Sequence, residues 1–107
     1  MSPQQPYTLV YAPVIKEHLQ FVDKKHFSYI RATLLERLSF DPNERNRNRK
    51  PLIRPAFDEA TWELRFGPEN MFRVFYEVKA HEREVHILAF GLKLRDKLFV
   101  GGEEIEL

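Results

Sequence analysis

The stretch TWELRFGPENMFRVFYEVKAHEREVHILAF, residues 61–90, decides the fold because it holds three largely apolar segments separated by short polar connections. Residues 61–66, 71–79 and 83–90 are rich in the aromatic and β-branched residues that favour strands. The connections at residues 67–70 and 80–82 have the composition of turns. Three strands joined in this way predict an antiparallel meander.

Alternation gives each strand of this meander two different faces. One face is apolar and carries Trp62, Leu64, Phe66, Phe72, Val74, Tyr76 and Val78. The opposite face carries Glu63, Arg65, Arg73, Phe75 and Glu77. We therefore expect one face of the sheet to pack on helices and the other face to be open and partly polar.

The first forty residues supply the elements that would cover the apolar face. Residues 7–11 read as a short strand, and Pro13 fits the first turn of a helix. Asp23 is a suitable N-cap for a second helix, which Asp41-Pro42 would end. Apolar residues recur at helical spacing at Ile15, Leu19, Val22, Phe27, Ile30, Leu34 and Leu38. The chain thus predicts a single α+β domain over residues 1–107, with an N-terminal strand and a two-helix hairpin packed on a mainly antiparallel sheet.

The composition bounds the class of protein. The chain has 107 residues with 17 Lys plus Arg, 16 Asp plus Glu and 43% apolar residues, as expected for one soluble domain. It has no cysteine, which excludes disulfides and thiolate chemistry, and its four histidines have no spacing typical of a metal site. No export signal or bilayer-length apolar run is apparent. We expect a cytoplasmic protein that binds neither metal nor membrane.

Positive charge is concentrated in NERNRNRKPLIRP, residues 43–55, where Glu44 is the single acid. The cationic side chains of this run are Arg45, Arg47, Arg49, Lys50 and Arg54. We expect an extended loop whose last part, residues 51–57, returns toward the sheet. A concentrated cationic patch attracts phosphates, so these side chains are candidate contacts of a nucleic acid. A merely solvated loop, or one that binds an acidic protein segment, fits the same composition.

The order of strand, two helices, basic connector and meander resembles the RelE/ParE superfamily of toxins from type II toxin-antitoxin systems. The resemblance is carried by WELRFGPENMFRVFYEV and ILAFGLKLRDKLFVGGEE and spans roughly residues 7–104. Its most specific parts are the aromatic-x-Leu-Arg strand, the aromatic-Arg-Val-x-Tyr strand around Arg73, and the last strand, which runs into Gly91 and a cationic segment.

This resemblance implies a toxin that a cognate antitoxin protein holds inactive. The RelE-like branch, which we favour, contains mRNA interferases that cleave messenger RNA on the ribosome without a metal and so inhibit translation. The ParE-like branch poisons DNA gyrase. A non-catalytic module that binds nucleic acid or protein on the same fold is a further alternative. The expected partners of the favoured branch are the antitoxin, the ribosome and mRNA, with no cofactor.

The resemblance also implies catalytic positions. Arg73 matches the arginine in the corresponding strand of the ribonucleases, and Arg65 falls where that branch often has a second basic residue. Arginine suits this role because its planar fork binds two phosphate oxygens and stays charged. As an alternative, Arg73 would pair with Glu63 or Glu77 across the sheet face.

A second cationic cluster lies in GLKLRDKLF, residues 91–99. The ribonucleases often carry an arginine soon after the glycine, a position that Lys93 or Arg95 could fill. If this segment stays extended, alternation places Lys93, Arg95 and Lys97 on one side.

Two positions depart from the ribonuclease pattern. Glu63 stands where the best-known members have lysine, and Phe99 stands where a tyrosine is expected. Phe99 cannot transfer a proton but could stack on a base. The alternative groups for proton transfer are then His86 or a lysine of lowered pKa. The two departures are the main support for the non-catalytic alternative. The terminal GGEEIEL, residues 101–107, reads as a flexible or edge-associated tail.

Overall fold

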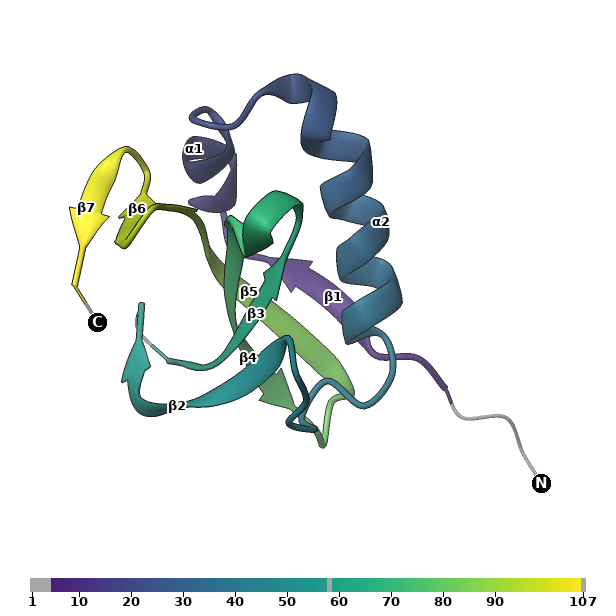
Figure 1. The fold of residues 1–107 in the computed structure, drawn as a ribbon. Helices are drawn as coiled ribbons and strands as arrows, with labels where there is room; N and C mark the ends of the chain where they lie inside the picture. The colour runs from purple at the N-terminus through teal and green to yellow at the C-terminus, as the bar shows by residue number, and fades with distance from the viewer. Residues whose placement is uncertain (1–4, 58, 107) are drawn as a thin grey trace.

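A curled, mainly antiparallel sheet of seven strands frames the protein in the computed structural model, which describes residues 5–57 and 59–106 (Figure 1). The strands are β1 (Thr8–Tyr11), β2 (Arg49–Ala56), β3 (Ala60–Phe66), β4 (Phe72–Lys79), β5 (Glu84–Leu94), β6 (Lys97–Val100) and β7 (Glu103–Ile105). They follow the order β2-β3-β4-β5-β6-β7. β1 pairs in parallel with the first part of β5, and β6 pairs with its last part. The α+β class and the antiparallel meander are thus confirmed.

The helical segments connect β1 to β2 and cover one face of the sheet (Figure 1). They are α1 (Ile15–Leu19), the 3-10 helix η1 (Lys24–His26) and α2 (Phe27–Leu38), and a further 3-10 helix, η2 (Pro68–Asn70), joins β3 to β4. Asp23 is the predicted N-cap: its carboxylate accepts a hydrogen bond from the Lys25 N–H at 3.0 Å. This bond satisfies one of the free amide groups at the start of the helical segment.

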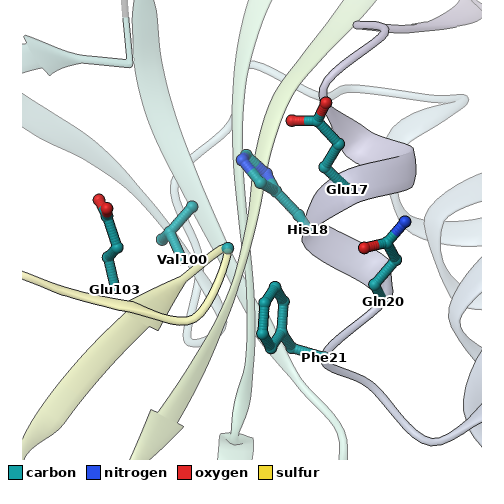
Figure 2. Close-up of a pocket in the computed structure, with 7 residues that line it drawn as sticks. Glu17, His18, Gln20, Phe21, Val100 and Glu103 are labelled. Carbon is teal, nitrogen blue, oxygen red and sulfur yellow. The ribbon is translucent and has the colours of Figure 1, made fainter.

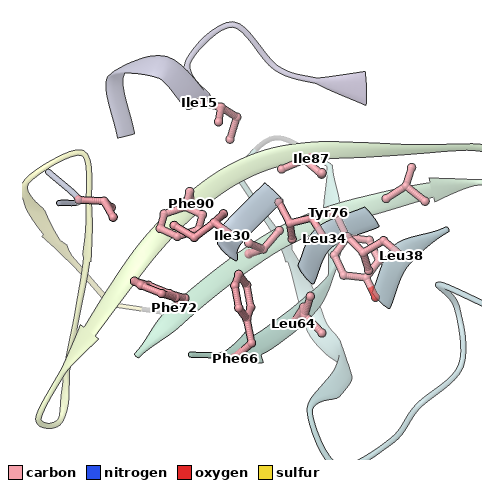
Figure 3. Close-up of a cluster of buried hydrophobic side chains, with 13 residues drawn as sticks. Ile15, Ile30, Leu34, Leu38, Leu64, Phe66, Phe72, Tyr76, Ile87 and Phe90 are labelled. Carbon is pink, nitrogen blue, oxygen red and sulfur yellow. The ribbon is translucent and has the colours of Figure 1, made fainter. Parts of the chain in front are cut away.

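The main core lies between the helices and the sheet (Figure 3). Its fully enclosed side chains are Leu38, Leu64, Phe72, Val74, Tyr76, Val85 and Ile87. They come from α2 and from the helix-facing sides of β3, β4 and β5. The predicted apolar faces of the meander are therefore correct, and burial of these side chains is the principal source of stability.

The opposite face of the sheet is less open than the sequence predicts. A second buried cluster forms there from Ala60, Phe75, Ala89, Leu98 and Val100. Side chains of both outer parts of the sheet, Leu52 and Ile105, pack against it. The sheet therefore curls, and its two edges enclose a small apolar core together with the polar side chains of this face.

The basic connector is partly a strand and not only a loop. β2 pairs antiparallel with β3 through Arg49, Lys50 and Pro51, and pairing resumes at Ala56 after an irregularity. β2 is an edge strand of the sheet. Proline is tolerated on an edge because it has no N–H to donate to a further strand. The prolines that suggested a loop are therefore compatible with the observed position.

The segment 91–99 is not one extended strand. β5 ends at Leu94, and the chain turns through Arg95 and Asp96 into β6, with Leu94 opposite Lys97. Arg95 has a left-handed φ of 60° in this turn. We expected Lys93, Arg95 and Lys97 to share one side only if this segment stayed extended, and that condition is not met because the chain reverses between them.

A glycine turn begins the terminal segment, residues 101–107. Gly101 and Gly102 have φ values of 61° and 81° and link β6 to β7. Two positive φ values in a two-residue hairpin turn favour glycine. Residues 103–105 pair with β6, so this part of the terminal segment is associated with the sheet edge.

Buried Arg49 fixes the connector to the end of α2. Arg49 is only 6% exposed. Its guanidinium donates hydrogen bonds to the backbone carbonyl oxygens of Asp41, Glu44 and Arg37. The carbonyl of Arg37 belongs to the last turn of α2, where a cation also interacts favourably with the helix dipole. Next to it, the Tyr76 hydroxyl donates to the Pro42 carbonyl at 2.7 Å. Arg49 therefore has a structural position and is not available on the surface.

We predict that Arg49→Met lowers the free energy of unfolding by roughly 3 kcal/mol, because three carbonyl groups lose their charged donor. Urea denaturation measures this change. Arg47→Met is the matched control, since Arg47 lies exposed on the same connector and should change stability by less than about 0.5 kcal/mol. Equal losses in the two variants would contradict the structural role of Arg49.

His18 connects α1 to the sheet and to the glycine turn (Figure 2). Its Nδ1 accepts a hydrogen bond from the Phe90 N–H at 3.1 Å. A Cβ atom on Gly101 would lie 3.3 Å from the imidazole, so the turn packs directly on this ring. Burial lowers the pKa of His18, although neighbouring Glu17 opposes the shift. The neutral imidazole is the form that can accept the Phe90 hydrogen bond.

A lowered pKa in the folded state means that the unfolded chain binds the His18 proton more tightly. The stability contributed by neutral His18 is therefore present above the unfolded-state pKa of about 6.5 and is lost as the pH falls below it. We predict that the free energy of unfolding decreases between pH 7.5 and pH 5.5, and that His18→Gln makes this decrease smaller. An unchanged pH dependence in the variant would contradict the assignment.

Candidate functional site

A groove of about 1630 Å³ lies on the concave face of the sheet, between β2 on one side and β6 and β7 on the other. Its cationic lining residues are Arg45, Lys50, Arg54, Arg65, Arg73, Lys93 and Lys97. Its acidic lining residues are Glu63, Asp96, Glu104 and Glu106. Cations are in excess, so the groove is suited to an anionic ligand.

The register of three strands brings the central charged side chains together. Arg65 of β3 lies directly opposite Arg73 of β4, and Glu63 of β3 lies opposite Lys50 of β2. Glu63 and Arg65 are two residues apart and so share a face of β3. Because the intervening Leu64 is buried in the main core, this face is the one turned away from the helices.

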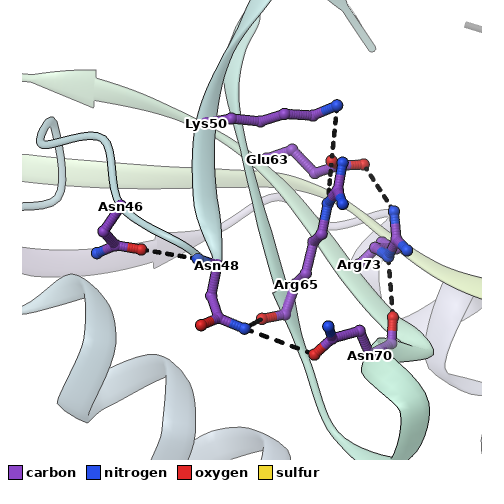
Figure 4. Close-up of polar contacts among 7 residues, drawn as sticks. All are labelled: Asn46, Asn48, Lys50, Glu63, Arg65, Asn70 and Arg73. Atoms are coloured by element: carbon purple, nitrogen blue, oxygen red, sulfur yellow. Dashed lines mark hydrogen bonds and ion pairs between the residues drawn. The ribbon is translucent and has the colours of Figure 1, made fainter.

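Glu63 is the centre of the charged cluster (Figure 4). Its Oε1 lies 3.1 Å from Nε of Arg65 and 3.7 Å from Nζ of Lys50. Its Oε2 lies 3.5 Å from Nη1 of Arg73. The residue is only 4% exposed, so its charge is compensated by these three cations. One carboxylate among three cations leaves the cluster net positive.

Arg73 is held from two sides. Its Nε donates to the Asn70 carbonyl at 2.9 Å, while Nη1 faces Glu63 (Figure 4). Asn70 belongs to η2 and has a left-handed φ of 56°. Burial lowers the pKa of Arg73, with Glu63 opposing this shift and Arg65 adding to it. The guanidinium remains charged at neutral pH because the ordinary pKa of arginine is so high. The alternative pairing of Arg73 with Glu63 is thus present.

Arg65 is positioned through its backbone. Its N–H donates to the Asn48 carbonyl at 2.8 Å, and its carbonyl accepts from Asn48 Nδ2 at 3.3 Å. Asn48 is itself fixed by a hydrogen bond from its N–H to the side chain of Asn46, at 2.9 Å. The connector thus supports the strand that presents Arg65.

Six of the sequence-predicted residues meet in the groove: Arg65, Arg73, Lys93, Arg45, Lys50 and Arg54. The four predicted residues that do not line it are Arg47, Arg49, Arg95 and Phe99. Arg49 is buried under the connector, and Arg95 lies in the β5–β6 turn. Phe99 follows Leu98, which lines the groove, so strand alternation turns Phe99 to the other side of β6.

The sequence did not predict the apolar side chains that line the groove, nor its rim on β6 and β7. Leu52, Phe57 and Leu98 line it beside the charged cluster, and Phe57 packs on Phe75 with ring centroids 4.9 Å apart. On the rim, Lys97 Nζ lies 3.9 Å from Glu104 Oε1. The glycine turn was the signal for this rim, because it returns the acidic residues to the sheet.

His86 lies outside the groove lining. Its Nε2 is 2.9 Å from Glu84 Oε1 on the same strand. Within residues 5–57 and 59–106, no group of three or more His, Cys, Asp or Glu side chains could hold a metal ion. No helix in this part of the chain is long and apolar enough to cross a membrane.

No protein-family model matches the chain, and no curated protein is significantly similar to its sequence.

Proposed function

We propose that this protein is a cytoplasmic toxin of the RelE/ParE type, a metal-independent endoribonuclease that cleaves mRNA on the ribosome and is neutralised by a cognate antitoxin. The observation that carries the proposal is the cluster of Arg65, Arg73 and Lys50 around Glu63 on the floor of a cationic groove. The RelE-like resemblance of the same strands supports the choice of RNA as the ligand.

The cluster suits a phosphate that gains charge during cleavage. Arg73 uses Nε to bind Asn70 and Nη1 to face Glu63. A phosphate oxygen would bind the remaining N–H groups of this guanidinium, whose side chain is 11% exposed. Arg65 and Lys93 also line the groove. Cations placed where charge develops stabilise the phosphorane.

The remaining cations would guide the RNA strand. Arg45 and Arg54 line the groove from the connector side, and Lys97 lines it from β6. Contacts of this kind bind the phosphate backbone without reading sequence, and their strength falls as salt displaces them. The apolar wall at Phe57 offers a surface for an unpaired base.

We predict that expression in a bacterial host arrests growth and produces new mRNA ends at codon-phased positions, and that Arg73→Ala abolishes both effects. The reason is the loss of the guanidinium that stabilises the transition state, which typically costs about 10²–10³ in rate. Lys24→Ala is the control, because Lys24 is exposed on η1 and lies outside the groove lining.

The other outcomes of this experiment identify the alternatives. Arrest with intact transcripts and gyrase-dependent DNA breaks would replace the ribonuclease with a gyrase-directed toxin. Absence of arrest would favour the non-catalytic binding module.

We also predict a difference between connector arginines in binding to single-stranded RNA. Arg45→Ala and Arg54→Ala should each reduce the slope of log K against log salt by up to about 0.7, the value for one phosphate contact on a single strand. Arg47→Ala removes the same charge from the same connector but outside the groove lining, and should change the slope less. Equal changes in all three variants would mean that RNA does not follow the groove.

A further inference from the structure

Cleavage through the ribose 2′-hydroxyl needs a group that takes its proton, and the groove offers few such groups. Lysine and arginine ordinarily carry their protons at neutral pH. The residues that line the groove include no histidine among the described ranges. The available acceptors are four carboxylates, those of Glu63, Asp96, Glu104 and Glu106.

Position separates Glu63 from the other three carboxylates. Asp96, Glu104 and Glu106 are exposed, and Glu104 pairs with Lys97 on the rim. Glu63 is buried on the floor and contacts both arginines of the cluster. A carboxylate and a phosphate that bind the same guanidinium lie close enough for one ribose hydroxyl to reach both.

We propose that Glu63 is the general base of the cleavage reaction, an assignment that rests on the proposed ribonuclease function. Its Oε2 contacts Arg73 at 3.5 Å, which is longer than a strong charge-assisted hydrogen bond, so this oxygen retains the capacity to accept another proton. The side chains of Arg65 and Lys50 are 34% and 45% exposed. A phosphate that draws these two cations outward uncovers Glu63 for the substrate.

The proposed reaction conserves protons and electron pairs in the following steps. The 2′-hydroxyl transfers its proton to Glu63, and the electron pair of the 2′-oxygen forms a bond to phosphorus. The bond from phosphorus to the 5′-oxygen breaks, and that oxygen takes a proton from solvent water in the open groove. The products are a 2′,3′-cyclic phosphate and a 5′-hydroxyl end, and Glu63 returns its proton to the solvent hydroxide.

The test compares Glu63→Gln with the wild type in cleavage of a reporter mRNA on programmed ribosomes. We expect the cleavage rate at saturating protein to fall by about 10²–10⁴, as for loss of a general base. RNA affinity should be retained or increased, because a negative charge has been removed from a phosphate site. Glu63→Asp should keep part of the activity, and its rate should still decline at acid pH. Glu63→Gln should lose this decline. Glu77→Gln, a half-buried residue of β4 outside the groove lining, is the control.

Each result decides the assignment. Wild-type cleavage that persists in a folded Glu63→Gln variant with an unchanged pH profile would overturn the role of Glu63 and leave the ribonuclease function intact. An uncut messenger with the wild type would overturn both. If Glu63→Gln does not fold, Glu63→Asp decides, since a purely structural role would lower RNA affinity and cleavage together, whereas a general base that has been shortened lowers cleavage alone.

Discussion

The pairing of β3 with β4 is the constraint on which the rest of the structure depends. Leu64 pairs with Val74 in the main core, and Arg65 pairs with Arg73 on the opposite face. A slip of either strand by one residue would turn its arginine toward the helices and its apolar side chains into the groove. The same burial that stabilises the fold therefore also places the cations side by side.

Charges in this small domain have two different structural uses. Arg49 is enclosed by backbone carbonyls and joins the connector to the end of α2. Glu63 is enclosed by side-chain cations, and without it three like charges would face one another. Because buried charges need compensation, each group fixes the geometry around it. The first arrangement holds the edge strand, and the second holds the candidate site.

Local patterns were sufficient for the meander, the N-cap at Asp23 and the shared face of Arg65 and Arg73, because each depends on neighbours close in sequence. The sequence did not predict strand β2, because prolines are typical of loops and are also compatible with an edge strand. Arg47 and Arg49 could not be distinguished because both lie in one polar run, and only the position of α2 decides which one is buried. The family-level function remains a prediction from resemblance.

The groove itself could not be predicted from alternation. It requires the sheet to curl so that β2 and β7, which are far apart in sequence, line the same space. Alternation also did not predict the reversal of the chain at Arg95. Because of this reversal, Lys93 of β5 and Lys97 of β6 line the groove, whereas Arg95 lies in the turn between them. Glu63 was interpreted as a departure from the ribonuclease pattern and as an alternative partner of Arg73. Its contacts also bring Arg65 and Lys50 to the same carboxylate.

The most direct measurement is an NMR titration of the protein with a short single-stranded RNA, following the side-chain Nε–H signals of the arginines. If the groove binds the phosphate backbone, the signals of Arg65 and Arg73 shift together with the backbone amide of Lys93, and added salt reverses the shifts. Shifts confined to α1 and α2, with the Arg65 and Arg73 signals unchanged, would contradict the assignment of the groove as the RNA site.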